Sequence, residues 1–582
     1  MSISDPTDKR PTSEAEDEPY RSDGVTADGS QASRDFAGSR LSPRPTGAGL
    51  ALERALVACV MLFLGVTGLS TLLVTASLPN YDNAVVFSFS RAPLVVAGIA
   101  VILAFLLRVC GRGVLVRIDE RKLAIGVVVY ALIAGTIWVL SARVWPDWDS
   151  LDLINAALEM GQRGSIFYEH GGYLYRFPYQ MGYVFLIRLV SLVAHGHTYL
   201  LLEALNIVFT AWILYLVIAI TRELFASRRA VGICCVLCLL FLPLIFYVTF
   251  AYAIAIGLAF ALLGLLLQIR AIARGSKRLG FESALAISAS CILKSNMLVA
   301  LAAMAVVWLC HLIGYRALSS ACGLATLLAV YATASLSISL ITLRICGMET
   351  SHGIPTSVPI AMGLSDTGGE NYGWYNGYSW KYDAEHYSVE RYDREARTII
   401  RSQVDRFVAD PGYAWTFFSK KYWSEWCMPT YESLLASNWR GSSRPEVPVM
   451  TKRPYTPLAR IVYYGALHDA ILGMLDVLQT LIIAGALIEV ISDRIRCRRD
   501  QRRRDPGCAS DAVHRGGLRV QHMGPLLFAA GSALFYLFWE AQSQYVMPAY
   551  VALLPFAAGG ISVALDGIGC RHRTRAVEET SR

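Results

Sequence analysis

A series of long apolar segments constrains this chain more than any other feature of its sequence. Segments of near membrane-crossing length recur from about residue 55 to about residue 566, for example at 122–143, 251–270 and 319–343. A helix needs about 20 predominantly apolar residues to cross a bilayer, where it satisfies its own backbone hydrogen bonds. The pattern predicts an all-α polytopic membrane protein. Segment 282–313 is too long for one straight span and is interrupted by ILKSN, so it forms either one kinked helix or two short ones. Counted with the other apolar segments, it gives an expected total of twelve or thirteen transmembrane helices.

The composition agrees with a membrane protein, and the distribution of charge predicts its orientation. The chain is 54% hydrophobic and only 17% charged, which excludes an ordinary soluble protein. The net charge is +8, and arginines cluster at 494–504 and 571–575. Such runs also occur in nucleic-acid-binding proteins, but beside apolar segments they mark the cytoplasmic face. We expect a multi-pass protein of the cell membrane, with the bilayer as a partner and no nucleic acid.

Polar stretches divide the chain into five parts. The N-terminal stretch has no apolar periodicity and has the composition of disordered segments. The parts that we expect are a disordered cytoplasmic tail at 1–50, a transmembrane region at 51–343 that includes an outer loop at 144–177, a large extracytoplasmic loop at 344–460, C-terminal transmembrane helices at 461–569 with an Arg-rich cytoplasmic loop at 491–520, and a cytoplasmic tail at 570–582.

The positive-inside rule meets one conflict. Basic residues at 112–122 place that turn inside, so that the loop 144–177 lies outside. Two full spans between 178 and 220 would then put Arg222, Arg228 and Arg229 outside as well. Either one of these two segments does not cross the membrane, or the rule fails at this loop.

A cluster of carboxylates stands directly after one apolar segment, in WPDWDSLDLINAALEMG at 145–161. Asp147 and Asp149 come first, and the residues that follow predict an amphipathic helix on the membrane surface. Asp149 could serve only as the N-cap of that helix. The chemical alternative is that one of the two carboxylates is a general base.

Aromatic residues are concentrated in the two outer loops, at 168–185 and 353–383. Their rings can stack on sugar faces, but exposed aromatic residues also form the interfacial belts of membrane proteins. The candidates for sugar contact are Trp374, Tyr375, Tyr378 and Trp380.

The chain shows neither a P-loop nor a glycine fingerprint for a nucleotide. If sugars are handled on the outer face, we therefore expect a polyprenyl-phosphate donor. That chemistry needs a carboxylate for the acceptor proton, cationic or polar groups for the leaving phosphate and an apolar groove for the lipid.

Several motifs together resemble the GT-C class of integral-membrane glycosyltransferases, and within it bacterial family-39-like proteins related to protein O-mannosyltransferases. DWDSLDLINAALEMG resembles the acidic start of their first outer loop, and FPYQMGYVF resembles their Pro-led re-entry into the next span. ILKSN is similar to a Lys-Pro-Asn element with Ser295 in place of Pro, and WEAQSQYVMP to a Glu-x-x-x-Arg-Tyr element with Gln544 in place of Arg. The resemblance covers about 120–560 and implies a GT-C-like bundle with surface helices in the first outer loop and a larger second outer loop.

The resemblance implies roles for individual residues. Asp149 is the expected catalytic base and Asp147 the runner-up, and the four loop aromatics are expected to contact the acceptor. The expected contacts to the donor and its phosphate are Lys294, Arg176, Glu540 and Tyr545.

The implied activity is an inverting, polyprenyl-phosphate-dependent hexosyltransferase that acts on a cell-envelope glycan or protein. The sequence shows no required cofactor and no metal set, and a divalent metal has no support from the residues. The alternatives are a transporter or flippase of lipid-linked glycans and a non-catalytic membrane scaffold. A disulfide between Cys346 and Cys427 is an option if the large loop is extracytoplasmic.

Overall fold

A computed structural model gives the fold of a chain that is helical almost throughout. It describes the chain over residues 46–79, 84–89, 91–111, 117–144, 146, 148–366, 371–383, 388–436, 456–502 and 519–580. Among these residues nine helices are long and apolar enough to cross a membrane, or ten if the bent pair Arg228–Leu240 and Pro243–Thr249 is one span. The prediction of an all-α polytopic membrane protein is therefore confirmed, with fewer long spans than expected.

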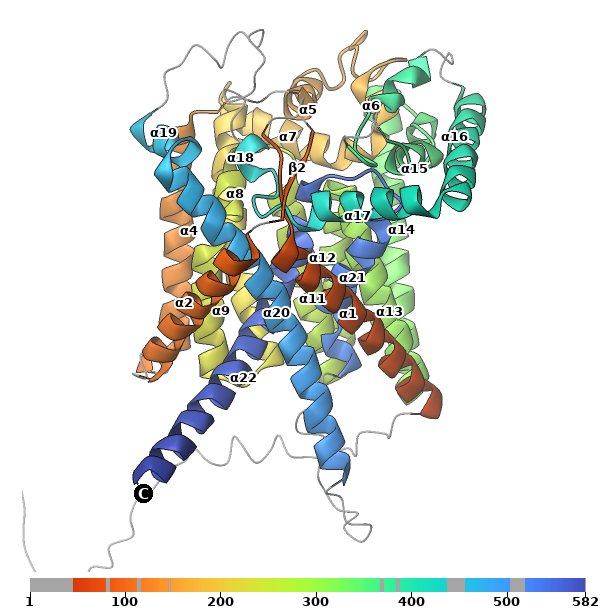
Figure 1. The fold of residues 1–582 in the computed structure, drawn as a ribbon. Helices are drawn as coiled ribbons and strands as arrows, with labels where there is room; N and C mark the ends of the chain where they lie inside the picture. The colour runs from red at the N-terminus through yellow and green to blue at the C-terminus, as the bar shows by residue number, and fades with distance from the viewer. Residues whose placement is uncertain are drawn as a thin grey trace, which may run out of the picture. The chain divides into compact units, whose positions relative to one another are not determined.

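The nine long helices form one bundle, in which some are upright and others are strongly tilted in the view of Figure 1. They are α1 (Gly47–Leu73), α2 (Ala92–Gly111), α4 (Glu120–Ala142), α8 (Thr198–Leu224), α11 (Ile254–Arg274), α13 (Leu298–Tyr315), α14 (Leu318–Cys346), α20 (Ala466–Arg502) and α22 (Met547–Thr580). The shorter apolar helices are α7 (Met181–Ala194), α9 (Arg228–Leu240), α12 (Lys277–Leu293) and α21 (Gly524–Tyr536).

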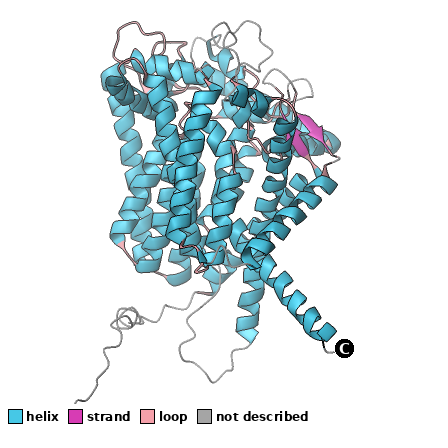
Figure 2. Ribbon diagram, turned by 90° about the vertical axis from the view of Figure 1, so that its left-hand side faces the viewer, coloured by secondary structure: helices cyan, strands magenta, loops and turns pink. Residues whose placement is uncertain are grey.

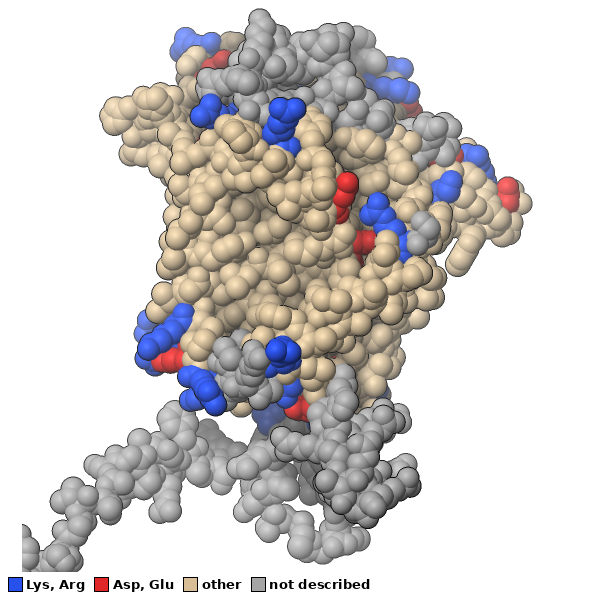
Figure 3. All heavy atoms as spheres, turned by 60° about the vertical axis from the view of Figure 1, so that its left-hand side comes forward, with Lys and Arg blue, Asp and Glu red and all other residues tan. Residues whose placement is uncertain are grey.

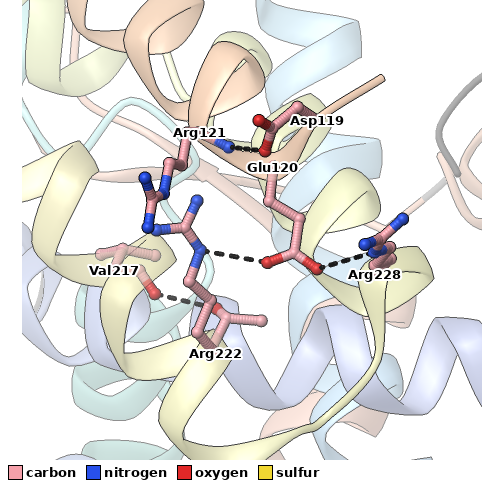
Figure 4. A network of polar contacts seen from close by, with 7 residues as sticks. Asp119, Glu120, Arg121, Val217, Arg222 and Arg228 are labelled. Atoms are coloured by element: carbon pink, nitrogen blue, oxygen red, sulfur yellow. Dashed lines mark hydrogen bonds and ion pairs between the residues drawn. The ribbon is translucent and has the colours of Figure 1, made fainter. Parts of the chain in front are cut away.

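An ion-pair network decides which of the two segments between 178 and 220 crosses the bundle. Arg222 near the end of α8 lies with its Nε 3.3 Å from Glu120 Oε2 at the start of α4, and Arg228 pairs with the same carboxylate (Figure 4). The end of α8 therefore meets the beginning of α4. Since α8 starts only a few residues after the short α7 ends, α7 does not cross. Arg121 and Arg222 thus lie at one end of the bundle, as the positive-inside rule requires.

The interrupted segment 282–313 forms two antiparallel helices instead of one kinked helix. Helix α12 ends at Leu293, the 3₁₀ turn η4 covers Ser295–Met297, and α13 follows. A Cβ atom on Gly280, near the start of α12, would lie 4.0 Å from Trp308, near the end of α13. Lys294 therefore stands at the turn of a helical hairpin.

The two loops at 144–177 and 344–460 lie at the other end of the bundle, where α4 ends (Figures 1 and 2). The first outer loop contains α5 (Trp148–Leu158), α6 (Tyr173–Arg176) and the 3₁₀ turn η2 (Pro178–Gln180). A short antiparallel hairpin of β1 (Thr75–Ser77) and β2 (Val86–Ser88) lies at the same end. The second loop contains α15 (Ser357–Gly363), η6 (Tyr378–Asp383), α16 (Val389–Ala409), α17 (Pro411–Trp426), α18 (Ser433–Ala436) and α19 (Pro457–Tyr463).

Helix α22 is central and α2 is peripheral. The most apolar stretch of α22 is 89% buried within the protein, whereas that of α2 is only 11% buried. Helix α22 packs closely on α20, because a Cβ on Gly560 would meet the Gly485 carbonyl oxygen at 1.9 Å. Figure 3 shows one face on which Lys and Arg lie towards the two ends, with a broad uncharged band between them. Such a band is the surface that a bilayer would cover.

Candidate functional site

Asp149 lies in the first turn of α5, inside the helix that begins at Trp148, and it is not the N-cap residue. Asp147 lies outside the described residues. Burial raises the pKa of the Asp149 carboxyl, against the effects of the Tyr252 hydroxyl, the Lys294 charge and the Tyr173 hydroxyl. The side chain is nevertheless exposed to solvent. Asp149 is thus an exposed residue whose carboxyl stands among protein groups that shield it in part from water.

Lys294 is brought to Asp149 by the α12–α13 hairpin turn. Its side chain is only 7% exposed, and Nζ lies 3.5 Å from the centre of the Tyr252 ring in a cation–π contact. Its positive charge acts on both Asp149 and Glu540. Gly257 in α11 permits this close packing, because a Cβ there would lie 2.8 Å from the Lys294 Cβ.

Two tyrosine hydroxyls beside Asp149 are fixed by one amide. Gln180 Nε2 donates to the Tyr173 hydroxyl at 2.8 Å and to the Tyr252 hydroxyl at 3.2 Å. Gln180 is the last residue of η2, two residues after Pro178, so the Pro-led re-entry places it. Sequence reasoning did not single out these three residues. The FPYQMG motif contains Gln180 and gave a signal for it, whereas nothing local marked Tyr252, which precedes α11 by only a few residues.

Glu540 and Tyr545 enter the same site from the connection between α21 and α22. The Tyr545 hydroxyl donates to Glu540 Oε1 at 2.9 Å. The pKa of Glu540 is raised to about 7, mainly by burial and also by the negative charge of Asp149. The Tyr545 hydrogen bond and the charges of Lys421 and Lys294 act in the opposite direction. Asp149, Lys294 and Glu540 are therefore neighbours in space although they are far apart in the sequence.

Two buried charged residues hold the segment that carries Glu540. Glu432 Oε1 accepts hydrogen bonds from the Ser543 backbone N–H at 2.7 Å and from the Ser543 hydroxyl at 3.0 Å. Lys421 Nζ donates to the Trp539 carbonyl at 2.7 Å and to that of Gly363 at the end of α15. Both side chains are almost fully buried. Glu432 and Lys421 were not among the residues that the sequence marked for the site, although Lys421 lies in the aromatic stretch DPGYAWTFFSKKYWSEW at 410–426.

Gln544, which stands where the resemblance expects an arginine, is mostly buried and donates to the Gln542 side-chain oxygen. Arg176, the arginine that the sequence proposes for the phosphate, lies in α6. Arg176 is only 3% exposed, and its Cζ lies 3.5 Å from the centre of the Trp380 ring. The second outer loop thus contacts the first through this stacked pair.

The four aromatic residues expected to contact sugar fall into two groups. Tyr375 is 40% exposed and Trp380 is 52% exposed. Tyr375 lies close to Asp149 and Glu540, whose negative charges, after burial, help to raise the pKa of its hydroxyl. Trp374 and Tyr378 are nearly buried. Trp374 Nε1 donates to Ser424 Oγ at 2.8 Å, and the Tyr378 ring packs on another tyrosine. Only Tyr375 and Trp380 therefore present surface to a ligand.

The remaining sequence candidates lie apart from this site. Cys346 and Cys427 are both free thiols, and they belong to different hydrophobic clusters. Over the described residues, no group of three or more His, Cys, Asp and Glu side chains could hold a metal ion.

No family model matches this chain, and no curated protein matches it. A functional assignment therefore depends on the chemistry of the site formed by Asp149, Lys294, Glu540 and Tyr545.

Proposed function

We propose that this chain is an inverting glycosyltransferase that moves a hexose from a polyprenyl-phosphate donor to an acceptor hydroxyl on the outer face of the cell membrane. The acceptor class is a cell-envelope glycan or a protein. The observation that carries the proposal is that Asp149, Lys294 and Glu540, from distant parts of the sequence, are close enough for their charges to act on one another, with the exposed Tyr375 beside them.

Asp149 is the general base in this mechanism. Its carboxylate accepts the proton of the acceptor hydroxyl while the hydroxyl oxygen attacks the anomeric carbon. The bond from that carbon to the phosphate oxygen breaks in the same step, and its electron pair leaves with the phosphate. One displacement inverts the anomeric centre and needs no covalent intermediate. The Tyr252 and Tyr173 hydroxyls, fixed by Gln180, hold the carboxylate in place.

Lys294 and Arg176 stabilise the negative charge that develops on the leaving phosphate. Fixed cationic groups in a water-poor site act strongly on such charge, because they need not reorganise during the reaction. Glu540 assists by holding a proton below pH of about 7, which lowers its repulsion of the phosphate. Trp380 and Tyr375, whose side chains are exposed, then provide ring faces for a sugar beside Asp149 and Glu540.

The proposed orientation puts the site with Asp149, Lys294 and Glu540 outside the cell membrane. The Arg222 end of the bundle then lies in the cytoplasm. Glu120 and Glu282 neutralise part of the positive charge at that end. Arg274 and Lys277 add to the positive excess that the positive-inside rule uses. The chain is then a cell-membrane protein whose N- and C-terminal tails are cytoplasmic.

The test is transfer by purified protein in proteoliposomes. The donor is a polyprenyl-phosphate hexose labelled in the sugar, and the acceptor is an envelope fraction from cells that lack the gene. We expect label to appear in envelope glycan or protein. If the label crosses the bilayer while it stays on the lipid, the chain is a flippase. If neither a panel of hexosyl donors nor glycan analysis of the deletion strain reveals a missing sugar, the proposal is wrong.

A further inference from the structure

The corner between α16 and α17, in the second outer loop, carries two strongly exposed apolar side chains. Val408, next to the last residue of α16, and Trp415, in the second turn of α17, are each 76% exposed. Among the described residues, no other large apolar side chain outside the nine long helices is as exposed. A single apolar residue on a surface is ordinary, so the position of this corner relative to the bilayer decides whether the exposure has a meaning.

Aromatic packing and a helix cap fix this corner. The ring of Phe407 in α16 stacks on Tyr413, with 5.6 Å between the ring centres, and packs against Phe417 at 5.0 Å. Asp410 caps α17, because its side chain accepts a hydrogen bond from the Tyr413 backbone N–H at 2.9 Å. Trp415 therefore projects in the direction that α17 sets.

The face of α17 that carries Trp415 also contacts α1. Tyr422 follows Trp415 by seven residues and Trp426 by eleven, so at 3.6 residues per turn the three side chains lie along one face. The hydroxyls of Tyr422 and Thr67 are hydrogen-bonded at 2.6 Å. The Trp426 ring lies edge-on to the ring of Phe63, with 5.0 Å between their centres. Both partners belong to α1, so the side of α17 that bears Trp415 is the side turned towards this span.

These contacts place α17 at the boundary of the membrane. Thr67 lies six residues before the end of α1 at Leu73, which is about 9 Å along the helix at a rise of 1.5 Å per residue. Leu62 and Leu69, in the same part of α1, are 69% and 60% exposed, so this stretch presents apolar surface to the bilayer. Figure 1 draws α17 across the upper part of the bundle, where the outer loops begin. The face with Trp415 thus continues the apolar surface of α1 beyond the contact between the two helices.

We infer that α17 is a membrane-surface helix and that Trp415 lies in the headgroup boundary of the bilayer, at the end of the bundle that carries the outer loops. Trp is enriched at this boundary, because its ring is apolar while its N–H can still find a hydrogen-bond partner. The occupant is lipid and not a second copy of the chain, because the face is continuous with a span surface that the bilayer covers. The second outer loop is then attached to the bilayer close to Lys421, which holds the segment before Glu540 through the Trp539 carbonyl. This attachment does not depend on the proposed transfer reaction.

Spin-label accessibility in phospholipid nanodiscs tests this inference on the full chain. A single cysteine replaces Trp415, Thr398 or Leu336 in a cysteine-free background, and each variant carries a nitroxide. Thr398 is an exposed residue of α16 and gives the value for water, whereas Leu336 is 60% exposed in α14 and gives the value for lipid. Collisions with oxygen, which concentrates in lipid, and with a nickel chelate, which stays in water, report the depth of each label. We expect the label of Trp415→Cys about 5–10 Å into the boundary between headgroups and acyl chains, as for the apolar face of a membrane-surface helix.

Two outcomes overturn the inference. If the nickel chelate reaches the label of Trp415→Cys as readily as that of Thr398→Cys, this face of α17 is in water. If neither the chelate nor oxygen reaches it, another protein surface covers the face. Pro411→Cys repeats the measurement with Trp415 intact, because Pro411 is exposed and lies four residues earlier on the same face of α17. If a lower melting temperature shows that Trp415→Cys does not fold, the label of Pro411→Cys decides by the same criteria.

Discussion

Replacement of Asp149 by Asn separates catalysis from helix stability, because the structure gives a size for each effect. Asp149 lies in the first turn of α5, where a negative charge interacts favourably with the helix dipole by about 0.3–1 kcal/mol. Loss of that interaction changes a folding equilibrium by at most about fivefold. Loss of a general base instead costs about 10²–10⁴ in rate, which is about 2.7–5.4 kcal/mol in activation free energy. The two explanations therefore predict effects that differ by more than an order of magnitude.

Asn is suitable because its amide oxygen can still accept hydrogen bonds from the Tyr252 and Tyr173 hydroxyls. The local geometry should persist while the basic carboxylate is lost. The assay is the rate of sugar transfer in proteoliposomes, measured with saturating donor and normalised to the amount of folded protein. We expect a fall of about 10²-fold or more in kcat with little change in melting temperature.

Asp152→Asn is the matched control, since it makes the same change three residues later in the same helix. It should keep transfer within about fivefold of the unmodified chain, the limit set by the dipole term. If Asp149→Asn transfers sugar as fast as Asp152→Asn does, Asp149 is not the base. An equal fall in both variants, together with lower melting temperatures, would assign the effect to α5 stability.

Three further outcomes are expected. Lys294→Met should raise the KM for the donor about tenfold or more, by analogy with other hydrogen bonds to charged groups. Lys294→Arg should give a KM between those of the unmodified chain and of the Met variant. An unchanged KM in the Met variant removes Lys294 from the site. The pKa of Glu540 in the fold, about 7, lies above the ordinary value of 4.5, so its contribution to stability is present below pH 4.5 and is lost as pH rises through about 7. Melting temperatures measured from pH 5 to 8 should therefore fall more steeply for the unmodified chain than for Glu540→Gln, and parallel curves contradict this. For topology, single cysteines at the exposed positions Ser351 and Ala226, in a cysteine-free background, should react with an impermeant reagent from opposite faces of sealed vesicles; reaction from one face would show that the orientation of α8 or α14 is wrong.

The sequence by itself determined the membrane class, most of the spans and the residues worth testing. Hydropathy is a local property, so a run of apolar residues predicts a span wherever it occurs. A charged residue at the edge of such a run is conspicuous for the same reason, which is how Asp149, Lys294 and Glu540 could be selected. Their roles as base, phosphate contact and second carboxyl remain predictions.

Only the tertiary structure decided how these segments meet. Residues 178–194 are apolar enough to suggest a span, yet α7 stays at one end because the Glu120–Arg222 pair fixes the direction of α8. The ILKSN break could have kinked one helix, but α12 packs chiefly on α11 and α14 and α13 on α21 and α14, so the break became a hairpin turn that carries Lys294. Neither outcome is encoded in a local pattern, because each depends on contacts between segments distant in sequence.

The same reason explains the aromatic residues and the supporting residues of the site. Trp374 and Trp380 lie in one short sequence stretch with the same composition, but only the fold buries the first and exposes the second. Gln180 and Lys421 hold groups from other segments through hydrogen bonds that no sequence spacing predicts. Burial and hydrogen-bond partners are properties of the packed chain, so the residues that position the site became visible only in three dimensions.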